Sequence, residues 1–391
     1  MIKHSIDLNA KLPTTLKELG TVVLKDTNAD KINYISGNYV AICDKIFCVC
    51  DLIDVSTGEV WRIPQFEEEY GVNKCLGDSF DNSFIYVQTQ KGEEQPFKKL
   101  TKIDLKTKEP LWTAALSKVS KGRWNWTQSS EYIFYTDNKN IFTHSKTNGK
   151  MLKKHIRKNE GQPWKPKFSA FSRFFEFHNG FILADGWDTK TLQLTITCLN
   201  PLEDKVVWEL PLGKMAQTVA QKVIDNVLYM LCSSGKFYKI DVQTGNIISE
   251  TDTKQPFTKG FGFCEDGDNL SAYVINDPYD KKNKGRFVAI YNFKSDNIVV
   301  ENFTDVVEVP SYTMDSANGI IQNNLLYWLR GENIRIFDIA KKTEIFHIEA
   351  KDNIQEYLFL GNILYVVFTE NIENKQQQDC PYRNCILTQF G

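Results

Sequence analysis

The eight residues Asp241–Ile248, with the sequence DVQTGNII, contain the pattern that decides the fold. An Asp at the end of an apolar run is followed by a Thr-Gly pair and then by aliphatic residues. Asp side chains accept hydrogen bonds from the backbone two residues on, and Gly adopts the left-handed conformation that closes a hairpin. The stretch therefore predicts a tight turn between two antiparallel strands.

Seven copies of this pattern occur along the chain. They are Asp54–Trp61, Asp104–Trp112, Ser145–Leu152, Asn200–Trp208, Asp241–Ile248, Asn292–Val299 and Asp338–Phe346. Their first residues are 50, 41, 55, 41, 51 and 46 positions apart, close to the repeat of about 40 to 50 residues of four-stranded propeller blades. A catalytic constellation is not copied seven times, so the pattern indicates structure. Its last aromatic residues, Trp61, Trp112 and Trp208, are expected to cover the neighbouring blade.

An apolar run precedes each copy, and an eighth run, Ile363–Phe368, is followed by Cys385–Thr388. The sequence therefore predicts an all-β fold in which all 391 residues form a single closed β-propeller of four-stranded blades. Eight blades are favoured, and seven remain the alternative. Residues 1–30 are expected to supply the closing strand of the last blade, through Thr21–Leu24 or Ser5–Leu8. Closure removes exposed sheet edges that would otherwise promote aggregation.

The copies Asp54–Trp61 and Asp241–Ile248 resemble the repeat of quinoprotein-like propellers, the pyrroloquinoline-quinone repeat superfamily. The resemblance covers nearly the whole chain. Members of this superfamily include dehydrogenases and non-enzymatic scaffolds of outer-membrane assembly, so the fold alone does not define an activity. The dehydrogenases carry adjacent cysteines and a calcium-binding carboxylate group. Neither maps onto this chain, so the resemblance implies a non-enzymatic member with no cofactor, no metal and no catalytic residues.

Composition and charge narrow the classes of partner. The chain is 42% hydrophobic and 25% charged, which excludes a disordered protein. Its formal net charge of −2 gives no general attraction to nucleic acid or to an anionic membrane. The N-terminal residues contain no apolar core of signal-peptide length, and no stretch reaches the roughly 20 apolar residues of a membrane span. We expect a cytoplasmic protein that binds neither nucleic acid nor membrane.

The nine cysteines are odd in number and lie mostly in apolar runs, which is typical of buried thiols in a reducing compartment. Whether Cys380 and Cys385, on either side of a short turn, ever pair is left open. No histidine pairing accompanies the cysteines as a zinc site requires. The acidic segment Glu265–Asn269 is interpreted as a hairpin turn, because it lacks the bidentate Glu that completes a calcium loop.

One basic segment stands out, beginning at Lys150 and extending past Trp164. It is either a solvated outer strand with its loop or a surface that docks an acidic partner. Trp124, Trp126 and Trp187 lie outside the repeat positions and are predicted in loops, where aromatic residues often anchor partners; packing between blades is the alternative. The candidate partner-binding residues are Trp124, Trp126, Lys153, Lys154, Arg157, Lys158, Trp164 and Trp187.

A rigid propeller without a cofactor usually holds a macromolecule. We therefore expect a protein-binding module, and by analogy an immunity protein that neutralises a cognate bacterial toxin encoded nearby. Two alternatives remain open. One is a quinoprotein-like or lyase-type enzyme with an axial site, and the other is a scaffold with several partners, as WD-repeat proteins are.

Overall fold

A computed structural model shows strands and turns, and the residues that it describes contain no helix. The described residues are 7, 10, 13–25, 27, 31–44, 49–63, 70–78, 81–90, 97–116, 125–136, 140–156, 175–188, 193–203, 205–214, 217–260, 262–276, 285–306, 318–330, 333–349, 353–369 and 385–391.

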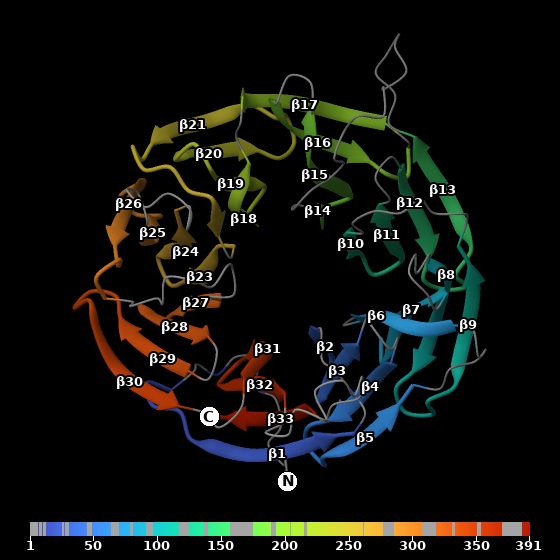
Figure 1. The fold of residues 1–391 in the computed structure, drawn as a ribbon. Coiled ribbons are helices and arrows are strands. Elements are labelled where there is room, and N and C mark those ends of the chain that lie inside the picture. Colours follow the sequence, from blue (N-terminus) through green and yellow to red (C-terminus); the bar gives the residue numbers. More distant parts are fainter. Residues whose placement is uncertain are drawn as a thin grey trace. The chain divides into compact units, whose positions relative to one another are not determined.

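The strands form eight antiparallel sheets that follow one another along the chain (Figure 1). The first three sheets contain β2 (Lys31–Ser36), β3 (Tyr39–Asp44), β4 (Val49–Asp54) and β5 (Glu59–Arg62); β6 (Tyr70–Asp78), β7 (Ser83–Gln90), β8 (Phe97–Asp104) and β9 (Pro110–Ala115); and β10 (Asn125–Gln128), β11 (Tyr132–Thr136), β12 (Asn140–Ser145) and β13 (Met151–Ile156). The next two contain β14 (Phe175–His178), β15 (Phe181–Asp188), β16 (Gln193–Asn200) and β17 (Lys205–Lys214); and β18 (Thr218–Ile224), β19 (Val227–Cys232), β20 (Lys236–Asp241) and β21 (Ile247–Asp252).

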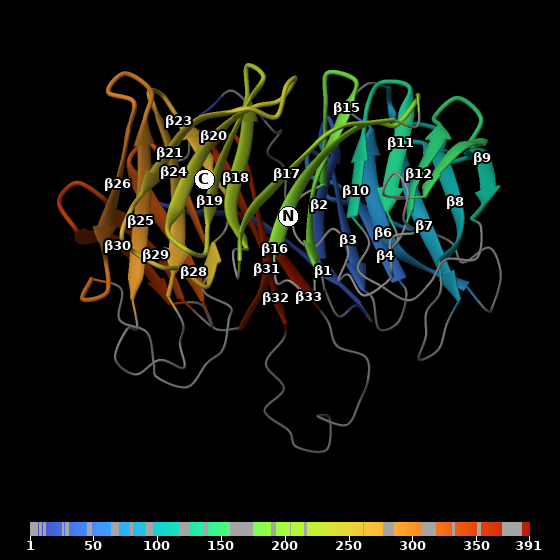
Figure 2. The same ribbon diagram turned by 90° about the horizontal axis from the view of Figure 1, so that it is seen from above.

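The last three sheets follow in the same way. They contain β22 (Lys259–Gly260), β23 (Cys264–Asp266), β24 (Asn269–Ile275), β25 (Arg286–Asn292) and β26 (Asn297–Asn302); β27 (Asn318–Gln322), β28 (Leu325–Arg330), β29 (Asn333–Asp338) and β30 (Thr343–Glu349); and β31 (Asn353–Leu360), β32 (Ile363–Thr369) and β33 (Cys385–Phe390), with β1 (Glu18–Leu24). Adjacent strands of one sheet run in opposite directions (Figure 2). Seven four-stranded sheets and one of five strands, whose first position is shared by the short β22 and β23, confirm the predicted propeller of eight blades and exclude the seven-blade alternative.

The chain divides into two compact units. One comprises Met1–Val119, Trp328–Ile336 and Glu344–Gly391, and the other comprises Ser120–Tyr327 and Phe337–Thr343. The seventh sheet contributes residues to both. That all 391 residues act as one domain stays a prediction.

The eighth sheet joins the two ends of the described chain. Its strand order is β1-β33-β32-β31, and Val22 of β1 lies opposite Leu387 of β33. Of the two predicted closing strands, Thr21–Leu24 is therefore the right one, and most of Ser5–Leu8 lies outside the described residues.

The seven predicted turns lie where the third strand of a sheet ends. Asp54 accepts a hydrogen bond from the backbone N–H of Ser56 at 2.9 Å. Asp241 accepts one from the N–H of Thr244 at 2.7 Å. Gly245 has a φ of 75°, which explains why glycine occupies this turn position. The repeated pattern is thus turn chemistry, as predicted.

Two of the repeated tryptophans cover a neighbouring sheet, as expected. The Trp208 indole N–H donates to the carbonyl of Val242 at 2.8 Å, and a Cβ at Gly245 would lie 2.6 Å from the Trp208 ring. In the other unit, the centroid of Trp61 is 6.4 Å from that of Phe84 in the next sheet. These tryptophans pack one sheet on the turn or strand of the next.

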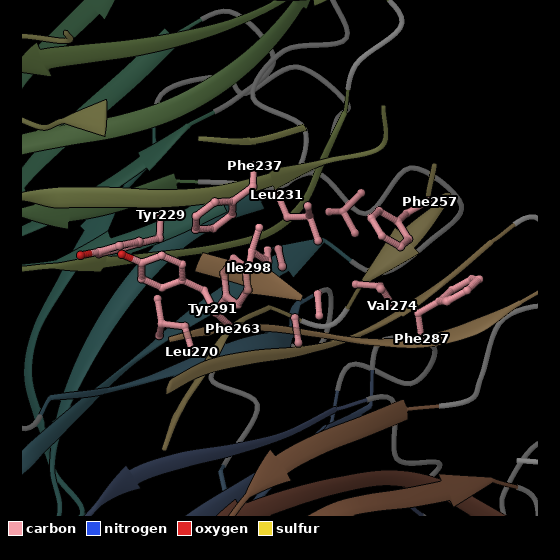
Figure 3. Close-up of a cluster of buried hydrophobic side chains, with 14 residues drawn as sticks. Tyr229, Leu231, Phe237, Phe257, Phe263, Leu270, Val274, Phe287, Tyr291 and Ile298 are labelled. Atoms are coloured by element: carbon pink, nitrogen blue, oxygen red, sulfur yellow. The ribbon is translucent and has the colours of Figure 1, made fainter. Parts of the chain in front are cut away.

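Apolar side chains fill the space between neighbouring sheets. Between the fifth and sixth sheets, Tyr229, Phe237 and Tyr291 form a buried aromatic cluster (Figure 3). The Tyr291 hydroxyl donates to Asp296 at 2.7 Å, and burial together with this carboxylate raises the pKa of Tyr291. Lys239 also binds Asp296 at 2.7 Å, so a charged contact closes the end of the apolar layer.

The sixth sheet differs in one detail, because its first strand is in two pieces. Both β22 and β23 pair with β24. Asp266 lies opposite Asn269, which leaves Gly267, with a φ of 59°, and Asp268 as a two-residue turn. The interpretation of Glu265–Asn269 as a hairpin turn is confirmed.

Candidate partner-binding site

Half of the predicted partner-binding residues lie in the described part of the chain. Trp126 is on β10, Lys153 and Lys154 are on β13, and Trp187 is on β15. Trp124, Arg157, Lys158 and Trp164 lie outside the described residues. The prediction that Trp126 and Trp187 lie in loops was wrong, because both belong to strands. Pairing with the neighbouring strand makes these strands longer than the apolar runs from which they were predicted.

A row of side chains crosses the third sheet from edge to edge. Trp126 lies opposite Tyr135, Tyr135 opposite Phe142, and Phe142 opposite Lys154. The rings stack with centroids 4.7 Å apart for Trp126–Tyr135 and 4.7 Å apart for Tyr135–Phe142. The Lys154 ammonium lies 5.6 Å from the Phe142 centroid, within range of a cation–π contact. The row fixes both Trp126 and Lys154 on one face of the sheet.

Of the predicted partner-binding residues, the aromatic Trp126 and the basic Lys153 and Lys154 therefore lie at different edges of the third sheet. β10 and β13 are opposite edges of the third sheet. With three strand spacings between them, their backbones are about 14 Å apart. The half-buried Trp126 therefore packs within the sheet, and the lysines present a surface of their own.

The surface at β13, which we call the β13 edge, consists of Lys150, Met151, Leu152, Lys153 and Lys154. Met151 is 42% exposed and Leu152 is 45% exposed, so two consecutive apolar side chains face solvent. Among the residues that the structure describes, none of the three lysines forms an ion pair with a carboxylate. No other described strand pairs with the outer side of β13. Such an edge offers backbone hydrogen bonds, apolar contact and positive charge together.

Three lysines on or beside strands of other sheets form ion pairs with carboxylates. Lys108 binds Glu59 at 2.7 Å. Lys236 binds Glu250 at 2.5 Å. Lys342 binds Glu301 at 2.7 Å. Compared with these positions, the β13 edge carries positive charge that is available to an external acidic group.

A buried histidine supports the turn that leads into the β13 edge. His144 Nδ1 lies 2.8 Å from the Gly149 carbonyl, and its Nε2 lies 3.1 Å from the Tyr135 hydroxyl. Burial lowers the pKa of His144. The neutral ring therefore donates from Nδ1 to Gly149 and accepts at Nε2 from Tyr135. No spacing motif in the sequence marks this residue.

A second titratable group is on β14, the first strand of the fourth sheet. Burial raises the pKa of Glu176, and the charges of Lys222 and His178 partly oppose that shift. Within the described ranges, no group of three or more His, Cys, Asp or Glu side chains is placed to hold a metal ion. Likewise, the described residues include no helix that is long and apolar enough to cross a membrane.

Comparison with known proteins identifies the fold. No family model matches the chain, and no curated protein matches it. BamB from Moraxella catarrhalis is similar in structure, with a TM-score of 0.60 and 14% identity over 95% of this chain and 97% of that one. The WD40 domain of SCAP from fission yeast has a TM-score of 0.61 and 9% identity, over 95% of this chain and 97% of that one.

A third solved structure belongs to an enzyme. The quinohemoprotein alcohol dehydrogenase ADHIIG from Pseudomonas putida HK5 has a TM-score of 0.58 and 11% identity, over 96% of this chain and 76% of that one. At these identities the similarities show the fold alone, which is a β-propeller. Whether the chain belongs to the quinoprotein-like superfamily stays a prediction.

Proposed function

We propose that this chain is a non-catalytic, protein-binding propeller of the cytoplasm that docks an acidic partner on the β13 edge. The observation that carries the proposal is the joint exposure of Met151 and Leu152 beside lysines that no described carboxylate neutralises. Electrostatic complementarity of this kind speeds association and selects partners of opposite charge. The BamB and WD40 similarities support a propeller of this general kind.

The use of the repeated carboxylates supports a non-catalytic protein. Asp104 accepts hydrogen bonds from the backbone N–H groups of Lys106 and Thr107 at 2.9 and 2.7 Å. These contacts lower the pKa of Asp104. Asp241 and Asp338 make the same kind of turn contact. Hydrogen bonding within the turns explains why Asp recurs at these positions, and no acid–base role in catalysis is needed to explain it.

The particular partner that we propose is a bacterial toxin encoded beside this gene, which the chain would neutralise as an immunity protein. An immunity protein binds one partner tightly, whereas a scaffold retains several. Co-expression with the neighbouring gene product is expected to restore growth of cells that the product alone arrests. Growth arrest that persists despite co-expression would rule out the immunity role.

The docking site is tested by charge reversal. We expect K153E/K154E to weaken binding of the neighbouring gene product by tenfold or more, measured by titration calorimetry at low salt, because two attractive contacts become repulsive. The matched control is K254E/K294E, which changes the net charge equally at two lysines that are 81% and 76% exposed elsewhere. Equal weakening by both pairs would show that net charge, and not the β13 edge, drives binding.

A further inference from the structure

Cys43 and Cys50 face each other across β3 and β4. The register places them directly opposite. The N–H of Val55 donates to the carbonyl of Asn38 at 2.9 Å, which makes that position a hydrogen-bonded pair of the same ladder. Hydrogen-bonded and non-hydrogen-bonded pairs alternate along antiparallel strands. Five residues further along each strand, Cys43 and Cys50 are therefore a non-hydrogen-bonded pair, in which side chains approach most closely.

The two sulfur atoms are close enough to become bonded. The Sγ atoms are 3.0 Å apart, about 1 Å more than the length of an S–S bond. Opposite Cα atoms of a non-hydrogen-bonded pair are about 4.5 Å apart, inside the range that disulfides span. Both side chains are thiols and are buried in the apolar cluster of the first and second sheets, beside Ala41 and Leu52.

We propose that Cys43 and Cys50 are a modification site that forms an intrachain, cross-strand disulfide on oxidation by a peroxide. The sulfur of one cysteine attacks a peroxide oxygen and becomes a sulfenic acid, with release of one water. The second sulfur then displaces the sulfenic hydroxyl, which leaves as another water, and the S–S bond forms. Two thiols and one hydrogen peroxide thus give one disulfide and two waters, the sulfurs losing two electrons to the peroxide.

Other buried cysteines provide an internal comparison. Cys198 and Cys232 lie in one apolar cluster of the other unit, and burial raises the pKa of each to about 12. The described contacts include none between their sulfur atoms. Proximity of two sulfurs, and not burial in an apolar core, distinguishes the Cys43–Cys50 pair.

The disulfide would lie in a part of the first sheet that an ion pair between Arg62 and Asp51 already stabilises. Next to Cys50, Asp51 is buried and receives both Nε and Nη2 of Arg62, at 2.8 and 3.0 Å. The Thr27 hydroxyl also donates to Asp51, at 2.9 Å. Thr27 belongs to the connection between β1 and β2, so a covalent link between β3 and β4 stabilises the sheet on which that connection rests.

The test is a peptide map of the folded full-length protein. After treatment with hydrogen peroxide, remaining thiols are alkylated and the protein is cleaved after Lys45, which separates Cys43 from Cys50. We expect the two peptides to be joined, with the mass of two hydrogens lost, and the oxidised protein to unfold at a higher temperature than the reduced one.

Variants identify the bonded pair. C48S is expected to retain the link and C50S to abolish it, while C198S/C232S retains it as the matched control. Two alkylated peptides under conditions that leave the protein folded would overturn the proposal, and so would a Cys43–Cys48 link in fragment spectra. The wild-type map decides the question even if C50S does not fold.

Discussion

His144 is enclosed by its own sheet at the turn before the β13 edge. It is one of five histidines in the chain, and its two ring nitrogens contact Gly149 and Tyr135. Only the neutral ring can accept the Tyr135 hydroxyl while donating to Gly149. Protonation reverses the Tyr135 contact, because Nε2–H must then donate to the phenol oxygen, and it places a charge in an apolar environment.

The free energy of unfolding should consequently depend on pH through His144. Because the folded pKa lies below the ordinary value of 6.5, the folded protein binds fewer protons than the unfolded chain. The contribution of His144 to the free energy of unfolding is therefore fully present above pH 6.5. Below pH 6.5 the free energy of unfolding decreases, by at most about 1.4 kcal/mol per pH unit. Urea unfolding of H144Q from pH 7.5 to 5.5 should show less of this decline than the wild type. The control H347Q, at a more exposed histidine, should retain it; an identical decline in H144Q would contradict the assignment.

Residues of this kind are hard to predict from sequence. The basic character of Lys153 and Lys154 is visible in the chain, but the lack of a described carboxylate beside them depends on which sheets are neighbours. The stacking of Trp126 on Tyr135 depends on strand register in the same way. Long-range pairing decides these properties, and local composition does not contain it.

At the scale of elements, the turns were the most predictable part of the molecule. Their hydrogen bonds connect residues only two or three positions apart, so a short stretch of sequence is enough to predict them. Asn200 and Asn292 replace Asp in two copies and accept the same backbone hydrogen bonds, from Leu202 and Lys294 at 3.0 and 3.1 Å. The side-chain oxygen, and not the negative charge, is the shared requirement.

This argument predicts the effects of two substitutions at Asp241. D241A removes the acceptor for Thr244 and should lower the free energy of unfolding by about 1 kcal/mol. D241N keeps an acceptor and should stay within about 0.5 kcal/mol of the wild type. Urea unfolding at neutral pH measures both. Equal losses for the two variants would mean that charge at this turn matters as much as hydrogen bonding.

At the scale of the whole molecule, the number of sheets followed from counting repeats, whereas the choice of closing strand did not. Both N-terminal candidates were short segments that contain aliphatic residues, and pairing with β33 identifies Thr21–Leu24 as the closing strand. The interruption between β22 and β23 was likewise invisible, because a broken strand and a continuous one share the same turn signals.

Two substitutions within β1 measure how much its pairing with β33 contributes to the free energy of unfolding. Leu24 is 1% exposed and belongs to the core of the eighth and first sheets, whereas Val23, next to it, is 55% exposed. L24A should lower the free energy of unfolding by about 3 kcal/mol, and V23A by no more than about 0.5 kcal/mol. Thermal or urea unfolding provides the comparison. A small effect of L24A would show that β1 contributes little to the stability of this sheet.

The pairing of β1 with β33 also constrains how the protein is made. The Cys385 thiol donates to the Thr27 carbonyl across 358 residues of chain. During translation at about 5 to 20 residues per second, β1 leaves the ribosome on the order of half a minute before its partner exists. Throughout that interval an apolar strand with unsatisfied backbone groups must be kept from pairing elsewhere, because the eighth sheet can be completed only after β33 has been synthesised.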